Sequence, residues 1–197
     1  MKDSWQSGDP YEYFMGRWSH IVGQSFIDWL SVSPGKKWLD IGCGTGALSD
    51  AVLRIQNPSE LVAIDQSEGF VTSAQQRLGS SVHCEVGNAM DLSFQDSSFD
   101  YVISGLVLNF IPEPEKALRE MKRVAASGGA VAVYIWDYSG KMEFLKYFWD
   151  AVVDLDPSGL DLHEGIRFPN SNAEGLQRLF EDAGLPDTIV EPLEVET

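Results

Sequence analysis

Three glycines follow a short apolar run near the start of the chain, and this segment restricts the fold more than any other. The apolar residues 38–41 are typical of a buried strand, and Gly42, Gly44 and Gly46 come directly after them. Side chains at these positions would hold the backbone away from a ligand or forbid a turn with positive φ. The segment therefore predicts a strand, a tight turn and a helix whose first N–H groups face a polar or anionic ligand.

Strand-like and helix-like segments alternate along the rest of the chain. The predicted strands are 38–41, 61–65, 81–86, 99–105, 130–136 and 188–195, and the predicted helices are 18–31, 47–55, 68–78, 114–124, 141–153 and 172–183. A turn is expected at 127–129, before the fifth strand. This alternation predicts an α/β fold with a doubly wound, mostly parallel sheet covered by helices on both faces.

The charge balance excludes several classes of partner. The 197 residues include 14 basic and 30 acidic side chains, which gives a formal charge of −16. Nucleic acids and anionic membranes recruit lysine and arginine patches, so the sequence favours a small-molecule or neutral-to-basic substrate and no nucleic acid. No apolar run reaches the roughly 20 residues that cross a bilayer, so no membrane insertion is expected. Cys43 and Cys84 have neither disulfide nor metal-ligand spacing. We therefore expect a cytoplasmic protein without a metal site.

Asp65, at the end of the second predicted strand, is the second signal for a ligand. An acid at this place can accept hydrogen bonds from both hydroxyls of a ribose. The alternative role is to cap the next helix, which Ser67 could do instead. The glycines leave the nucleotide open, because Gly42, Gly44 and Ala47 also fit the dinucleotide pattern G-x-G-x-x-A. A nicotinamide-dependent oxidoreductase therefore stays in view at this point.

Residues 37–136 resemble the class I S-adenosylmethionine-dependent methyltransferases, in the small-molecule branch that includes the ubiquinone/menaquinone methyltransferases. The matching landmarks, in chain order, are 38–46, 63–65, 87–92, 99–102 and 117–129. The resemblance implies a single Rossmann-like methyltransferase domain over 1–197. Its parts would be an N-terminal helical cap (1–36), a cofactor-binding core (37–136), and substrate-side helices with a last strand (137–197).

The resemblance also implies which residues hold the cofactor, S-adenosylmethionine, and its product S-adenosylhomocysteine. The expected contacts are Asp40, Gly42, Cys43 and Gly44 at the methionine end, Asp65 at the ribose, Gln66, Asn88 and Ala89 at the adenine, and Ser104 and Leu106 beside the sulfonium. The commonest family pattern has aspartate at position 88. The Asn88 amide carbonyl can still accept a hydrogen bond from the adenine amino group, so we expect binding with altered affinity.

The N-terminal residues 11–18 resemble the segment that folds over the cofactor in this branch. Arg17 could then pair with the cofactor carboxylate, or it could be an ordinary solvated helix residue. Methyl transfer from a sulfonium to a small molecule is a direct displacement, and a base is needed only for a protonated nucleophile. His163 is the candidate catalytic base. A second reading is a catalytically silent module that binds the same cofactor.

The end of the chain departs from the resemblance. The fold implied by the family has two more strands after the fifth, the last one antiparallel. The sequence offers only residues 188–195 as a candidate, so we expect the final antiparallel strand to be lacking from this chain or supplied by a partner. An uncovered sheet edge pairs readily with another chain, and a homodimer is therefore compatible with the sequence.

Overall fold

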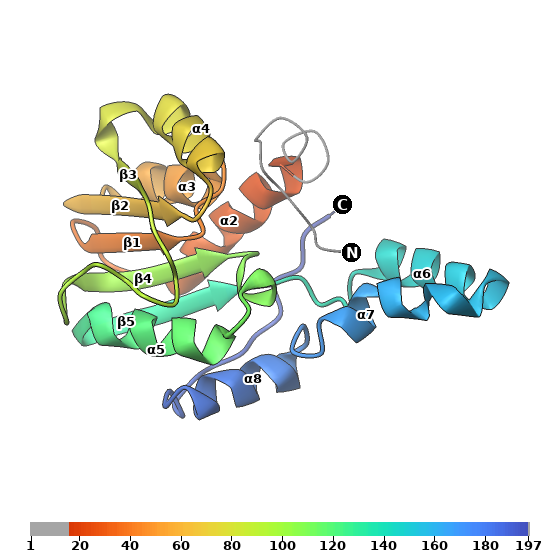
Figure 1. The fold of residues 1–197 in the computed structure, drawn as a ribbon. Helices are drawn as coiled ribbons and strands as arrows, with labels where there is room; N and C mark the ends of the chain where they lie inside the picture. The colour runs from red at the N-terminus through yellow and green to blue at the C-terminus, as the bar shows by residue number, and fades with distance from the viewer. Residues whose placement is uncertain (1–15, 197) are drawn as a thin grey trace. The chain divides into compact units, whose positions relative to one another are not determined.

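The computed structural model describes residues 16–196, which fall into two compact units (Figure 1). The larger unit comprises residues 16–134 together with 193–196, and the smaller comprises residues 135–192. No helix among the described residues is long and apolar enough to cross a membrane. Most of the predicted covering segment 11–18 lies outside the described residues, and the single-domain organisation stays a prediction.

The larger unit contains a five-stranded sheet and four α-helices. The strands are β1 (Lys37–Ile41), β2 (Glu60–Asp65), β3 (His83–Val86), β4 (Phe99–Gly105) and β5 (Ala125–Tyr134). The helices are α2 (Arg17–Leu30), α3 (Ala47–Gln56), α4 (Glu68–Leu78) and α5 (Pro114–Val124), with single 3₁₀ turns at Gly79–Ser81 and Leu108–Phe110. The predicted doubly wound sheet is confirmed, and four of its six predicted strands match to within two residues.

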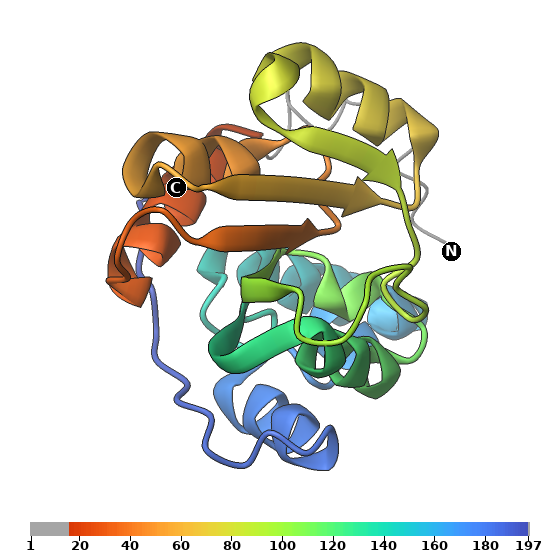
Figure 2. The same ribbon diagram turned by 90° about the vertical axis from the view of Figure 1, so that its left-hand side faces the viewer.

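All strand pairs are parallel, in the spatial order β3-β2-β1-β4-β5. The arrowheads of β1 and β2 therefore point the same way in Figure 2. In chain order, β2 and β3 are added on one side of β1, and β4 and β5 are then added on its other side. The order in which strands are added therefore reverses beside β1. Right-handed crossovers put α3 and α4 on one face of the sheet and α5 on the other. The carboxyl ends of β1 and β4 meet at this reversal, where open α/β sheets bind ligands.

The core of the larger unit forms because apolar residues fill both faces of its central strands. Trp38, Leu39 and Ile41 of β1 are at most 1% exposed. The Trp38 ring stacks on Tyr101 of β4 with centroids 4.6 Å apart, which adds a pair contact to the burial of both rings. On α5, the helical spacing of Ala117, Leu118, Met121 and Val124 places all four in the core. This packing holds the carboxyl ends of the strands in a fixed arrangement.

The turn expected at 127–129 is wrong, because these residues belong to the first part of β5. The strand begins at Ala125, and its register against β4 shifts between Phe99 and Tyr101. Phe99 pairs with Ala125 whereas Tyr101 pairs with Ala130, so the extra residues of β5 bulge out of the ladder. Gly128 takes a φ of +79° inside this bulge. The glycines therefore mark an irregular strand and not a connection before it.

The smaller unit is helical. It contains α6 (Glu143–Leu155), a 3₁₀ helix at Pro157–Leu162, α7 (Glu164–Arg167) and α8 (Ala173–Asp182). The last three begin with side-chain caps, in which Asp156, His163 and Asn172 accept hydrogen bonds from main-chain N–H groups. The helices predicted at 141–153 and 172–183 are confirmed, with shifts of one or two residues at their ends.

The strand predicted at 188–195 is wrong. Residues 185–196 contain no strand, and the described part of the sheet ends at β5. Pro192 interrupts the segment and removes a main-chain donor that a ladder would need. Glu191 and Glu194 also have low strand propensity, so the alternating apolar residues do not suffice.

One arginine anchors the long connection between β3 and β4. Arg123 of α5 donates to the main-chain carbonyls of Leu92 and Phe94, at 2.9 and 2.8 Å. The same guanidinium binds both carboxylate oxygens of Glu120 and one oxygen of Asp96. Glu120 in turn accepts the N–H of Leu92 at 2.9 Å, and these contacts lower the pKa of its carboxyl. The connection that carries residues 88 and 89 is thereby fixed to α5.

Arg123→Lys should destabilise the protein by roughly 1–3 kcal/mol, because a lysine cannot reproduce the planar fork that binds two carbonyls and two carboxylates at once. Urea unfolding measures this change. Arg54→Lys is the matched control, since Arg54 is 68% exposed and forms an ordinary surface pair with Asp50 one turn away. The control should change stability by less than about 0.5 kcal/mol. Equal effects of the two substitutions would contradict the anchoring role.

Candidate functional site

The glycine segment forms a tight turn between β1 and α3. Gly42, Gly44 and Gly46 have φ of +72°, +53° and +89°, the left-handed region that glycine adopts without steric cost. The N–H groups of Gly42 and Cys43 both donate to the carbonyl of Ile64 in β2, at 2.8 and 2.9 Å. The turn predicted between the first strand and the next helix is thereby held against the carboxyl end of β2.

Two of these glycines meet different surroundings. A Cβ atom at Gly42 would lie 2.5 Å from a methyl carbon of Val107, so this glycine is needed for packing inside the protein. A Cβ atom at Gly44 would meet nothing within 4 Å. The turn therefore presents open space at Gly44, beside the end of the sheet where a ligand is expected.

Asp65 ends β2 and ties the glycine turn to α4. One of its carboxylate oxygens accepts the N–H of Gly44 at 3.0 Å, and the other accepts the N–H of Ser67 at 2.9 Å. The cap of α4 is supplied by Ser67, whose hydroxyl accepts the N–H of Phe70. A carboxylate has about four lone-pair positions, so Asp65 can accept a further hydrogen bond beside those from the main chain. Burial raises the pKa of Asp65, and its hydrogen bonds from the main chain oppose this shift.

Asp40 lies one residue before the turn and is almost completely buried, at 1% exposure. One carboxylate oxygen accepts the hydroxyl of Ser49 at 2.6 Å, whereas the other has no hydrogen-bond partner among the described residues. Burial and, to a smaller extent, the negative charge of Asp65 raise the pKa of Asp40 to about 7, against the opposing hydrogen bonds from Ser49.

Cys43 is 6% exposed within the turn. Burial and the nearby charges of Asp40 and Asp65 raise the pKa of its thiol far above the ordinary value. The thiol therefore stays protonated at physiological pH and does not act as a nucleophile. Cys43 contributes its main chain to the turn, and its side chain fills the space beneath.

The ends of β3 and β4 complete this edge of the sheet. The Asn88 side-chain oxygen accepts the N–H of Met90 at 3.0 Å and closes a small turn that exposes residue 88 and half-buries Ala89. The Ser104 hydroxyl is buried and donates to the Ile41 carbonyl at 2.7 Å, so it links β4 to β1. Leu106 adopts a φ of +61°, a strained conformation for leucine that is enriched at functional sites.

Like Asn88, the predicted residues Gln66 and Arg17 lie on the surface. Gln66 is exposed directly after Asp65. Arg17 is exposed at the first turn of α2, where its guanidinium lies 4.3 Å from the centre of the Trp18 ring. This contact does not distinguish the two roles considered for Arg17, pairing with the cofactor carboxylate or an ordinary solvated helix residue. Both roles stay predictions.

His163 belongs to the smaller unit. Its Nδ1 accepts the N–H of Gly165 at 3.0 Å and so caps α7. Its Nε2 lies 3.5 Å from a carboxylate oxygen of Asp150. This geometry fits a neutral imidazole with its proton on Nε2. The catalytic role of His163 stays a prediction, and both of its ring nitrogens have structural partners.

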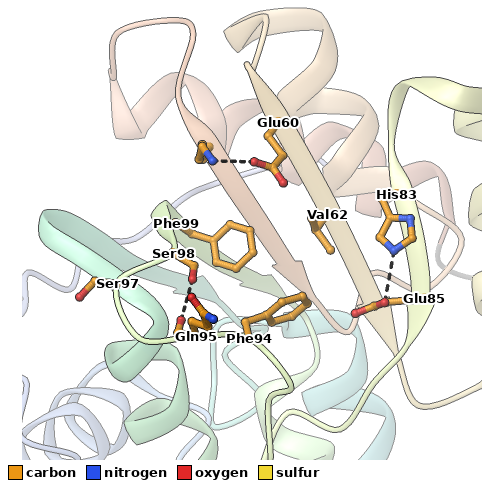
Figure 3. Close-up of a pocket in the computed structure, with 10 residues that line it drawn as sticks. Glu60, Val62, His83, Glu85, Phe94, Gln95, Ser97, Ser98 and Phe99 are labelled. Carbon is orange, nitrogen blue, oxygen red and sulfur yellow. Dashed lines mark hydrogen bonds and ion pairs between the residues drawn. The ribbon is translucent and has the colours of Figure 1, made fainter.

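A surface hollow occurs at the opposite, amino-terminal end of the strands (Figure 3). Its lining includes Glu60, His83 and Phe99, from the starts of β2, β3 and β4, and His83 pairs with Glu85 at 3.2 Å. None of the predicted site residues lines this hollow. Among the described residues, no three histidine, cysteine or acidic side chains come together as a metal site.

Sequence reasoning missed Ser49. Its hydroxyl is completely buried and is the partner of Asp40, yet it lies nine residues further along the chain, on α3. A serine in the first turn of a helix is common for other reasons, such as local hydrogen bonding to the main chain. Only the packing of α3 against β1 identifies its role.

A doubly wound parallel sheet, a glycine turn at its switch point and an acid at the end of the second strand are features of a Rossmann-like fold. The family described as "Methyltransferase domain" matches residues 39–133. A demethylmenaquinone methyltransferase of Staphylococcus aureus is 30% identical in an alignment 168 residues long, which covers 79% of this chain and 70% of that protein.

Solved structures share the fold. A SAM-dependent methyltransferase from Aquifex aeolicus has a TM-score of 0.63 at 18% identity, covering 85% of this chain and 81% of that one. The [4+2]-cyclase SpnF has a TM-score of 0.50 at 29% identity, covering 59% of this chain and 43% of that one. The chain belongs to the S-adenosylmethionine-dependent methyltransferase family. This membership decides against the nicotinamide-dependent alternative.

Gly44→Ala should weaken binding of S-adenosylhomocysteine at least tenfold, because the added methyl group enters the open space at the turn. Gly35→Ala is the matched control, since Gly35 also has positive φ, +76°, and open surroundings. Both substitutions should cost roughly 1–2 kcal/mol of stability from left-handed strain. Calorimetric titration and urea unfolding separate the two effects. Equal affinities for the two variants would contradict a ligand at the turn.

Asp40→Asn should flatten the pH dependence of stability in the ligand-free protein. The pKa of Asp40 is raised from 3.8 to about 7, so its contribution to stability is present below about pH 4 and is lost as the pH rises through 7. The slope removed is up to about 1.4 kcal/mol per pH unit. Urea unfolding between pH 5 and 8 measures it. Parallel curves for the two proteins would show that Asp40 does not titrate in this range.

Proposed function

We propose that this protein transfers the methyl group of S-adenosylmethionine to a small-molecule acceptor. The observation that carries the proposal is the joint placement of the glycine turn and Asp65, linked by the hydrogen bond from the N–H of Gly44 to the carboxylate at 3.0 Å. This arrangement offers open backbone for one part of a nucleoside ligand and two acceptor oxygens for its ribose.

The residues at this edge suit the successive parts of the cofactor. Asp65 would accept the two ribose hydroxyls, with Gln66 against the adenine. The exposed Asn88 would meet the adenine edge together with Ala89, because its amide still has donors and a second lone pair after bonding Met90. These assignments agree with the side-chain chemistry of each position.

A second group of residues would hold the other end of the cofactor. Asp40 and the main chain from Gly42 through Cys43 to Gly44 would hold the methionine portion. Ser104 and Leu106 would border the sulfonium, Ser104 through its main chain since its hydroxyl is bonded to Ile41. Arg17 would pair with the cofactor carboxylate.

When bound, S-adenosylmethionine would supply a methyl group activated by the sulfonium, to which the acceptor atom bonds while the carbon–sulfur bond breaks and S-adenosylhomocysteine leaves. The protein then has to orient the acceptor and exclude water, which requires shape more than reactive side chains. The buried, rigid ends of β1 and β4 supply a fixed platform for this. The proposal assigns no proton transfer to His163, whose Nδ1 caps α7.

The charge of the chain supports a small-molecule acceptor. With 30 acidic and 14 basic residues, the surface repels polyanions such as nucleic acids. The Staphylococcus aureus relative is named for demethylmenaquinone as its substrate, which fits the same class of acceptor. We also propose a cytoplasmic location, in which the unpaired thiols of Cys43 and Cys84 stay reduced.

A second candidate function is binding of the cofactor without methyl transfer. The similarity to the [4+2]-cyclase SpnF favours keeping it in view, because that protein is named for a different reaction. Methyl transfer to any acceptor would exclude this second function.

Calorimetric titration tests the cofactor directly. S-adenosylmethionine and S-adenosylhomocysteine should bind with micromolar affinity and NAD should not bind. Asp65→Ala should weaken binding at least tenfold, since two hydrogen bonds to a charged acceptor are lost. Asp28→Ala is the control, because Asp28 is exposed on α2 and has no part in the site. Absence of binding, or unchanged affinity in Asp65→Ala, would contradict the proposal. Transfer of a labelled methyl group to a panel of small molecules then tests the reaction.

A further inference from the structure

The two edges of the sheet differ in how well they are protected against pairing with another chain. β3, at one edge, is only four residues long and carries His83 and Glu85, whose side chains lie 3.2 Å apart at the surface. Short strands and charged side chains are common means of blocking an edge. β5, at the other edge, is ten residues long and has no charged residue (Figure 1). The β5 edge therefore lacks the protection that β3 has.

The regular part of β5 lies beyond the bulge and ends at Tyr134. The carbonyl of Tyr134 accepts the N–H of Leu106, so the main-chain groups of Tyr134 face β4. Main-chain groups of successive residues point to opposite sides of a strand, so those of Ala132 also face β4, whereas those of Val131 and Val133 point away from it. Within residues 16–196 the sheet ends at β5, and these outward groups have no strand partner.

The same edge is accessible and suited to a second copy of the chain. Residues 130–133 are each half-buried, whereas Trp38 and Leu39 of the central strand β1 have no exposed surface. The chain has a formal charge of −16, so two copies can approach closely only where few charges meet. The uncharged β5 meets this condition. A strand that pairs antiparallel with its own copy needs only to be complementary to itself.

We propose that two copies of this chain associate through β5, which pairs antiparallel with the same strand of the other copy about a two-fold axis at Ala132. This register pairs the whole regular part of the strand, residues 130–134, because Ala132 is its middle residue. Val131 of one copy exchanges N–H and C=O hydrogen bonds with Val133 of the other. The two Ala132 residues face each other across the axis without hydrogen bonds, at a Cα separation of about 4.5 Å, which small side chains suit. The inference does not depend on the proposed function.

Sedimentation velocity of the unaltered chain over a range of protein concentrations measures the association. The mass should rise from that of one chain, 21.8 kDa, to twice that value as the concentration increases. Added salt should strengthen the association, because the ions screen the repulsion between two acidic chains. A protein that stays monomeric at every concentration and salt tested would overturn the proposal.

Val133→Pro removes an outward N–H that the β4 ladder does not use, so it should make the protein monomeric without unfolding it. Ala132→Pro is the matched control, since it removes an N–H that faces β4 and should lower the urea concentration at the unfolding midpoint. Circular dichroism checks that Val133→Pro keeps the fold. Val131→Lys places a charge at the same edge and tests the contact without a proline. Undiminished association of both folded edge variants would place the interface elsewhere and contradict the proposal.

Ala132→Cys locates the two-fold axis. Cysteines that face each other in an antiparallel pair without hydrogen bonds are close enough to form a disulfide. Under mild oxidation this variant should therefore give a covalent dimer on a non-reducing gel. Two controls should stay monomeric on that gel: Ser127→Cys, at an exposed position in the bulge, and the unaltered protein with Cys43 and Cys84. Equal cross-linking of Ala132→Cys and Ser127→Cys would contradict pairing about Ala132.

Discussion

The carboxylate of Asp65 is the interaction on which the site depends. It accepts one N–H from the glycine turn and one from the start of α4, and so joins two loops that follow different strands. The parallel pairing of Asp40 with Ala63 and of Ile41 with Ile64 brings these loops to the same edge of the sheet. Without Asp65 the turn would keep its contacts to the Ile64 carbonyl but lose its connection to α4.

The same edge concentrates unfavourable charge. Burial raises the pKa of both Asp40 and Asp65, and each is an acid near another acid. Leu106 adds a strained backbone conformation at the end of β4. Such features reduce stability and persist where function requires them. A ligand that carries a cation and two hydroxyls would relieve part of this cost, so ligand binding should stabilise the protein.

The sequence predicts the central fold well because the relevant signals are local. The strand at Phe99–Gly105 and the helix at Pro114–Val124 were expected at the bounds that the structure has, and the strand before the glycines was expected to within one residue. Asp65 and the glycine turn were recognised because ligand binding requires those residue types at that spacing. Family resemblance then gave the identity of the cofactor, which the spacing alone left open.

The features that sequence reasoning missed depend on contacts between distant residues. The bulge at the start of β5 arises from its register against β4, and a glycine pair can equally be a turn. The strand expected at 188–195 had a suitable apolar pattern, but Pro192 outweighs it. Ser49 and Arg123 act through partners 9 and about 30 residues away, to which no local pattern points.

A crystal structure of the protein with S-adenosylhomocysteine tests the central claim most directly. The account predicts that the two ribose hydroxyls lie within hydrogen-bond distance of the Asp65 carboxylate. It also predicts that the methionine portion of the ligand lies against Asp40 and passes over Gly44. A ligand bound elsewhere, for example in the hollow at the amino ends of the strands, would contradict the account.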